Sequence, residues 1–136
     1  MITSDKQYTA AKEQLAMLMT SLSSRKKKKV PALIENAGKA QLQELISEIQ
    51  LNMKEYDALK NSNPSDIEIH SLDDLMITPI RYRIAAHMSV DAFSRKVGVS
   101  ARQIARYEQE GYRNTNSTTL QKILEVLNIR LNGKVA

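Results

Sequence analysis

The 136-residue chain has no cysteine and no tryptophan, and its aromatic residues are five tyrosines and one phenylalanine. The absence of cysteine excludes disulfide bonds, thiolate metal sites and a cysteine nucleophile. Because aromatic side chains are so few, the core must be built from Leu, Ile, Val, Met and Ala. Such a core is marginal in a chain this short, and self-association is one way to supplement it.

Long apolar runs are also missing. No segment approaches the roughly 20 apolar residues that cross a bilayer. The first residues include Ser4, Asp5 and Lys6, and they lack the continuous apolar stretch of a secretory signal. We therefore expect a cytoplasmic protein with no membrane partner.

The motifs of common enzymes do not occur either. The sequence has no glycine-rich phosphate loop, nucleophile elbow or Walker pattern. His70 and His87 have no metal-ligand spacing to each other or to a carboxylate cluster. The adjacent Asp73 and Asp74 are better explained by helix capping than as a pair of catalytic carboxylates. We predict no enzymatic activity, no metal site and no cofactor.

Charge is unevenly distributed along the chain, whose formal net charge is +5. Residues 63–74 hold four acidic residues and no base, whereas residues 75–136 hold ten Lys and Arg against four acids. A basic C-terminal half behind an acidic linker favours a polyanionic partner, although a solvated basic surface would show the same balance.

Two amphipathic helices are predicted in the first 62 residues, because apolar residues there recur at spacings of three and four. Thr3, Ser4 or Asp5 can cap the first helix, and its stripe consists of Tyr8, Ala11, Leu15, Leu18 and Leu22. A basic run from Arg25 to Lys29 interrupts the pattern, and Pro31 then suits the first turn of a second helix that runs from about Ala32 to Lys60. The a and d positions of this helix are Leu42, Leu45, Ile49, Asn52, Tyr56 and Leu59, with Ile46 and Met53 widening the stripe.

The second helix would be roughly 45 Å long, and it has no way to cover its own stripe. Its partner is either the first helix, folded back as a hairpin, or a second copy of the chain in a coiled coil. Asn52 in the seam is the kind of polar residue that sets register and strand number. We expect residues 1–62 to form a helical dimerisation arm.

Residues 63–74 are expected to form an acidic linker. Ile67 and Ile69 alternate with polar residues in a way that fits a short edge strand. Ser71 with Asp74 predicts a capped turn, and Thr78-Pro79 predicts a helix cap followed by the first helical residue.

The segment from Ser89 to Glu108 carries the clearest pattern. Ser89 can cap a helix whose inward residues are Phe93 and Val97, and Gly98 stands where the chain must leave that helix in a left-handed conformation. Val99 enters the core, and Ser100 caps a further helix with Ile104 and Tyr107 on its inner face. Over about Leu75 to Leu127, this spacing resembles the lambda-repressor-like helix-turn-helix family, the Cro or XRE type.

The resemblance implies an all-α, four- to five-helix DNA-binding domain over residues 75–136, with room for a short C-terminal strand. It also implies that the helix beginning after Ser100 lies in the major groove of double-stranded DNA. The residues this assigns to DNA are Ser100, Ala101, Arg102, Gln103 and Arg106 on that helix, with Arg113 and Asn114 in the following loop. Ser117 or Thr118 would cap the fourth helix, whose free N–H groups suit phosphate.

Two further features concern the frame of this domain. Arg83 and Glu108 match a family pairing that ties the first and third helices together. The departures are His87 where the family usually has Gly, Val90 where it usually has a phosphate-binding Gln, Ser94 for Ala, and a loop at Gln109 to Gly111 that is one residue longer. The turn Ser71 to Leu75 and the first residues resemble, more loosely, the helical extensions of some bacterial and phage members.

Two functions fit this sequence. The first is a transcriptional regulator, a repressor that binds an operator as a homodimer. The alternative is an antitoxin that neutralises a small protein toxin through its arm and autoregulates its own operon through the DNA-binding domain.

Overall fold

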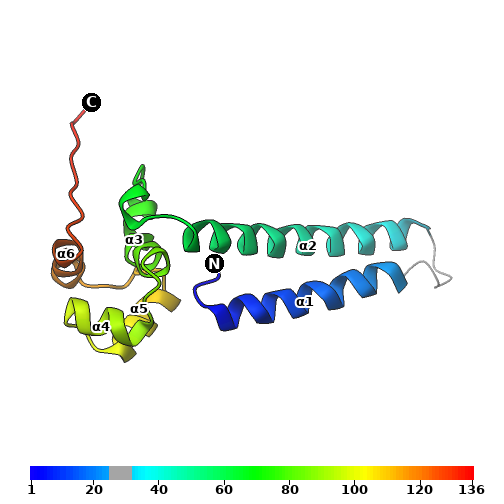
Figure 1. The fold of residues 1–136 in the computed structure, drawn as a ribbon. Helices are drawn as coiled ribbons and strands as arrows, with labels where there is room; N and C mark the ends of the chain where they lie inside the picture. The colour runs from blue at the N-terminus through cyan, green and yellow to red at the C-terminus, as the bar shows by residue number, and fades with distance from the viewer. Residues whose placement is uncertain (25–31) are drawn as a thin grey trace. The chain divides into compact units, whose positions relative to one another are not determined.

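The chain is α-helical in the computed structural model, which describes residues 1–24 and 32–136 (Figure 1). The helices are α1 (Asp5–Ser24), α2 (Ala32–Lys60), α3 (Leu72–Ala85), α4 (Val90–Val97), α5 (Ala101–Gln109) and α6 (Ser117–Val126), with a 3-10 turn at Pro64–Asp66. They form two compact units, Met1–Leu59 and Lys60–Ala136. The all-α prediction is confirmed, whereas the basic run Arg25 to Lys29 and Pro31 lie outside the described residues.

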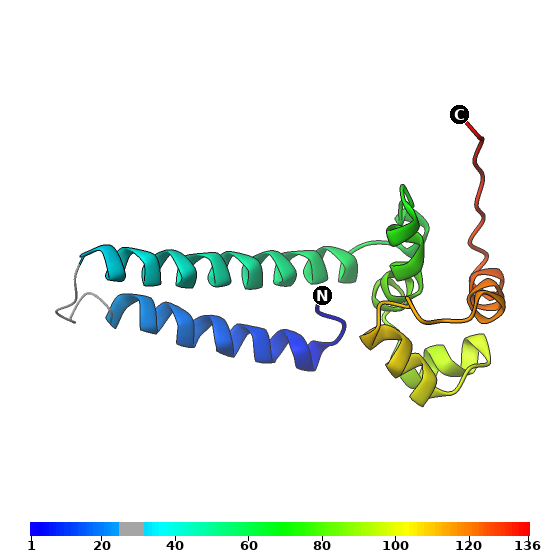
Figure 2. The same ribbon diagram turned by 180° about the vertical axis from the view of Figure 1, so that it is seen from behind.

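The first unit is an antiparallel hairpin of α1 and α2 (Figures 1 and 2). The side chain of Ser4 accepts a hydrogen bond from the Gln7 N–H at 3.1 Å and so caps α1. The predicted stripe of α1 is half-buried throughout, which agrees with its position facing α2. Of the two arrangements left open by the sequence, the hairpin is therefore present within one chain.

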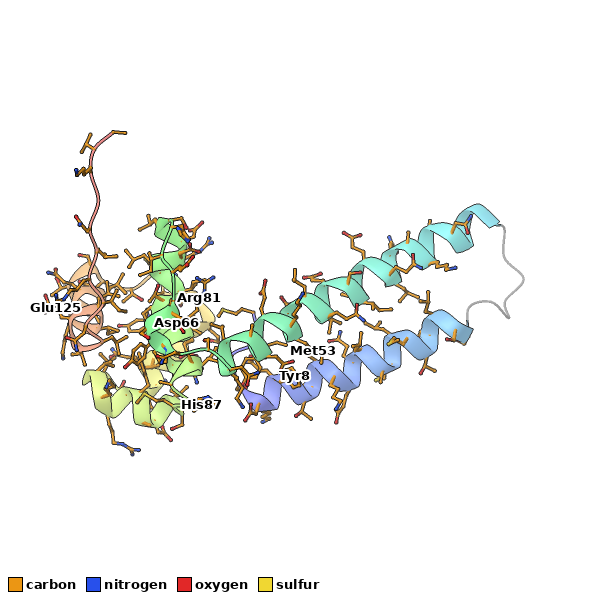
Figure 3. The ribbon with its side chains drawn as sticks, turned by 45° about the horizontal axis from the view of Figure 1, so that its top comes forward. Tyr8, Met53, Asp66, Arg81, His87 and Glu125 are labelled. Atoms are coloured by element: carbon orange, nitrogen blue, oxygen red, sulfur yellow. The ribbon has the colours of Figure 1, made fainter. Side chains whose placement is uncertain are left out.

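Two tyrosines fasten the open end of the hairpin, where the start of α1 lies beside the last turns of α2 (Figure 3). The rings of Tyr8 and Tyr56 lie 5.6 Å apart. The Tyr8 hydroxyl donates to Asp57 at 2.9 Å, and the Tyr56 hydroxyl donates to Asp5 at 2.7 Å. The bond to the Asp57 carboxylate raises the pKa of Tyr8. These long-range contacts set the register of the two helices.

The buried side of α2 is rotated from the predicted seam. Ile46, Ile49 and Tyr56 are buried, whereas Leu45, a predicted d position, is 38% exposed. The spacing of the buried residues is still that of an amphipathic helix, but α1 covers the side that holds Ile46. The other edge of the stripe is left partly open.

In the second unit, α3 starts at Leu72, seven residues before the predicted first helical residue, Pro79. The Ser71 side chain caps it by accepting from the Asp74 N–H at 3.1 Å. Pro79 is inside the helix, where it lacks the N–H of the regular ladder. Its burial beside Ile80 offsets that loss, so the prediction that Pro79 begins a helix is wrong.

The strands predicted in the linker and at the C-terminal end are also absent from the part of the chain that the structure describes. Residues 67–70 and 129–136 have no regular secondary structure. Neither segment pairs with a neighbouring strand, and a lone strand would leave its ladder groups unpaired. None of the described helices is long and apolar enough to span a membrane.

Candidate nucleic-acid interface

Local hydrogen bonds define the turn between α4 and α5. Ser89 caps α4 by accepting from the Ala92 N–H at 3.1 Å, and Ser100 caps α5 by accepting from the Gln103 N–H at 3.3 Å. Between them Gly98 adopts a left-handed conformation with φ +73°. An L residue with a side chain is strained there, so glycine fits this turn without steric cost. The three predictions for this turn are confirmed.

The inner faces of α4 and α5 anchor the turn in the core. Their buried residues are Phe93 and Val97 on α4 and Ile104 and Tyr107 on α5. Val99 between the helices is also buried, and Ile80, Ile84, Ile123 and Leu127 supply the opposing surfaces. Because one side of α5 is fixed in this way, its other side must face solvent.

The outer face of α5 is polar and basic. Arg102, Gln103 and Arg106 are exposed, Ala101 is half-buried, and the capping Ser100 is exposed. Arg102 makes no ion pair with the described residues, whereas the Arg106 Nε lies 3.7 Å from the Glu110 carboxylate. The sequence alone does not single out Glu110, although its i,i+4 spacing from Arg106 is a recognisable signal.

A buried ion pair holds α5 against α3. The Arg83 guanidinium donates to the two Glu108 carboxylate oxygens at 2.6 and 2.7 Å. The two side chains are only 6% and 7% exposed. Arg83 also donates to the Met88 carbonyl at 3.1 Å, so one guanidinium ties together the end of α3, the following turn and α5. A bidentate pair of this kind fixes orientation as well as distance.

His87 stands where the resembled family usually has a glycine, at the end of the first helix of the domain. It has a φ of +56°, and it follows Ala86, the C-terminal cap of α3. A left-handed residue at this position is the usual way to end a helix, and glycine is the residue that adopts it most readily. The conformation is therefore kept, with a side chain that makes it more costly.

The loop from Glu110 to Asn116 presents the two remaining predicted residues to solvent. Arg113 and Asn114 are both exposed. Asn116 caps α6, since its side chain accepts from the Thr118 N–H at 2.8 Å. The predicted cap, Ser117 or Thr118, is therefore wrong by one or two residues, because an Asn side chain can bond its own backbone two positions on.

Within this loop the side chain of Tyr112 is completely buried, and its ring lies 5.5 Å from the ring of Tyr107. Its hydroxyl has no hydrogen-bond partner among the described residues. Burial, together with the nearby Glu108 carboxylate, raises the pKa of Tyr112 well above its usual value. The phenol is therefore held neutral in the folded domain.

Replacing Tyr112 with phenylalanine is expected to raise the free energy of unfolding by about 1 kcal/mol, since a buried unpaired hydroxyl is removed. The gain should grow above pH 10. Above that pH, the Tyr112 hydroxyl of the parent is ionised in the unfolded state but stays neutral in the folded state. The parent therefore loses stability as the pH rises. Denaturant titrations at pH 8 and pH 10.5 measure both effects. A variant less stable than the parent at pH 8 would show that the hydroxyl has a partner.

The site that results is an exposed basic surface. It consists of the outer face of α5 (Ser100, Ala101, Arg102, Gln103, Arg106) and the adjacent loop residues Arg113 and Asn114. Arginine and glutamine side chains can bond the edges of guanine and adenine in two places each. Within residues 1–24 and 32–136, no cluster of His, Asp or Glu could hold a metal ion.

Comparison with known proteins matches part of this unit to a family. Residues 80–133 match a protein family described as Helix-turn-helix. This region holds α4, α5 and α6, together with most of α3. No curated protein and no solved structure matches the chain.

Proposed function

We propose that this protein represses transcription by occupying an operator as a homodimer. The premise is that residues 80–133 form a domain of the helix-turn-helix family of DNA-binding regulators. The observation that carries the proposal is the division of α5 into two faces. Ile104 and Tyr107 are buried on one face, while Arg102, Gln103 and Arg106 are exposed on the other. The first turns of such a helix are the part that meets base edges in the major groove.

The loop beside α5 supports a second type of contact. Arg113 and Asn114 are exposed in the loop that leads to the N-terminus of α6. A cation and a helix N-terminus together suit a phosphate group. We therefore assign Arg113 and Asn114 to the DNA backbone and the α5 residues to bases, which separates positioning from sequence reading.

Footprinting on the region upstream of the protein's own gene tests this function. A repressor dimer should protect two similar half-sites, related by a two-fold axis and spaced by about one helical turn, roughly 34 Å. Protection should weaken steeply as salt increases. Binding that shows no preference over scrambled duplex would contradict sequence-specific regulation.

The hairpin supports the dimer. Leu45, Asn52 and Leu59 are spaced by seven residues, one heptad, and α1 leaves Leu45 exposed and the other two half-exposed. A second copy that packs along this row would cover it as a coiled-coil seam.

Leu45→Glu is therefore expected to convert the full chain from dimer to monomer in sedimentation experiments, because a carboxylate cannot be buried in that seam. Leu51→Glu is the matched control. Leu51 is also an exposed leucine of α2, about half a helical turn away from the centre of the buried stripe. A parent that sediments as a monomer, or equal effects of the two variants, would contradict a dimer built on this row.

An antitoxin is the second candidate, favoured by apolar side chains exposed outside the hairpin seam. These are Met17, Met19 and Leu51, and flexible methionines are common on surfaces that bind proteins. In this case the product of a neighbouring gene should arrest growth, and co-expression of this chain should relieve the arrest. Met17→Glu should abolish relief while operator binding is unchanged; relief that survives would count against this surface.

A further inference from the structure

The linker and the C-terminal end of α6 border a groove in the second unit. One wall comes from residues 63–69 and the other from residues 127–130, and Thr78 and Tyr82 of α3 also line the groove. The hollow has a volume of about 530 Å³. We call it the linker groove. It is separate from the outer face of α5 and is not used in the proposed contact with DNA.

The linker wall ends in a short extended segment with unused backbone groups, whereas the other wall is the hydrogen-bonded end of α6. Burial alternates along residues 66–70, with Ile67 and Ile69 half-buried and the residues between them exposed. Among the described residues, no backbone hydrogen bond is made by Glu68, by Ile69 or by residues 130–136. Extended segments with free N–H and C=O groups are ready to pair with an added strand.

The tail, residues 130–136, has apolar residues at alternate positions, as an added strand would. Leu131 and Val135 share one face of an extended chain, since side chains alternate with a period of two. Leu131 is 55% exposed and Val135 is fully exposed. The tail runs away from α6 (Figures 1 and 2), and residues 131–136 are all exposed, so its apolar face is uncovered.

Charge makes the tail and the linker complementary. Asp66 and Glu68 alternate with the two isoleucines of the groove, and the tail carries Arg130 and Lys134 on the face opposite to Leu131 and Val135. Two strands that share a sheet place equivalent faces side by side, and opposite charges across strands are stabilising. In such a pairing, the apolar side chains of the tail would lie beside the two isoleucines. Its two basic side chains would lie beside the two acidic side chains of the linker.

We propose that the tail of one copy occupies the linker groove of a second copy as an added β-strand, so that the two DNA-binding units exchange tails. Backbone hydrogen bonds to Glu68 and Ile69 of the linker wall provide affinity, and the side chains on alternate positions provide selectivity. The exchange adds a second contact to the dimer proposed above, independent of the hairpin seam. It would also limit the separation of the two α5 helices and thus the spacing of half-sites.

Disulfide trapping in the full chain tests the exchange, because the parent has no cysteine. Copies that carry Ile69→Cys are mixed with copies that carry Leu131→Cys and mildly oxidised. We expect a mixed disulfide at least tenfold faster than when Glu125→Cys replaces Ile69→Cys, since Glu125 is exposed on α6 outside the groove. A disulfide forms only when the two Cβ atoms approach to about 4 Å. Adding Lys134→Glu to the tail should slow the trapping.

The outcomes separate this proposal from the dimer itself. The exchange is overturned if the mixed disulfide forms no faster than in the control. It is also overturned if a dilute chain with both Ile69→Cys and Leu131→Cys forms an intrachain disulfide, because the tail would then lie in its own groove. Sedimentation of the same variants without oxidation reports the dimer. A dimer without trapping overturns only the exchange, whereas a monomer at every concentration overturns both.

Discussion

Glu108→Ala is expected to lower the free energy of unfolding of the DNA-binding unit by about 3–5 kcal/mol, the usual cost of leaving a buried charge unpaired. The Arg83 guanidinium would remain buried among α3, α5 and the intervening turn after losing the partner that accepts two of its hydrogen bonds. For a domain of this size the loss corresponds to a fall in melting temperature of roughly 12 °C or more.

Glu125→Ala is the matched control for this change. Glu125 is an exposed glutamate on α6, and surface substitutions of this type usually change stability by less than about 0.5 kcal/mol. Joint replacement of Arg83 with methionine and Glu108 with leucine should recover much of the loss, because no charge is then left in the core. Thermal unfolding of the four proteins measures these differences. Equal melting temperatures for Glu108→Ala and Glu125→Ala would place the pair at the surface in solution.

Truncating Arg102 to alanine is expected to weaken binding to the operator by about 1–3 kcal/mol and binding to scrambled duplex by much less. The reason is that Arg102 lies on the exposed face of α5 with no ion-pair partner of its own in the described structure. Arg106→Ala should cost a few tenths of a kcal/mol less. The Arg106 guanidinium already faces Glu110 in the free protein, and an exposed i,i+4 pair has about that value.

Arg113→Ala should behave differently, because a phosphate contact carries no sequence information. It is expected to weaken binding to all duplexes alike and to reduce the slope of log K against log salt by about one unit. Titrations of each variant on operator and scrambled DNA at several salt concentrations separate the two behaviours. Equal losses on both duplexes for Arg102→Ala would contradict the assignment of α5 as the reading helix.

The groups that form the helix-turn-helix could be predicted from the sequence because their interactions are local. Ser89 and Ser100 each bond an N–H three residues on, and the left-handed Gly98 needs only the absence of a side chain. The inward residues Phe93, Val97, Ile104 and Tyr107 follow from the helical period. The assignment of particular side chains to DNA remains a prediction, since it depends on a partner.

Other features required the tertiary structure, because they depend on segments far apart in the sequence. The stripe of α2 is wide enough for either edge to be buried, and the covering position of α1 decides that Ile46 is buried and Leu45 is not. Pro79 reads as a helix start, yet packing around it lets α3 begin at Leu72. Ile67 and Ile69 alternate like a strand, but a strand exists only where a neighbour accepts its hydrogen bonds. The spacing of apolar residues and the helix caps are thus determined locally by the sequence. The buried face of α2, the first residue of α3 and the absence of strands in the described residues are instead determined by what each segment packs against.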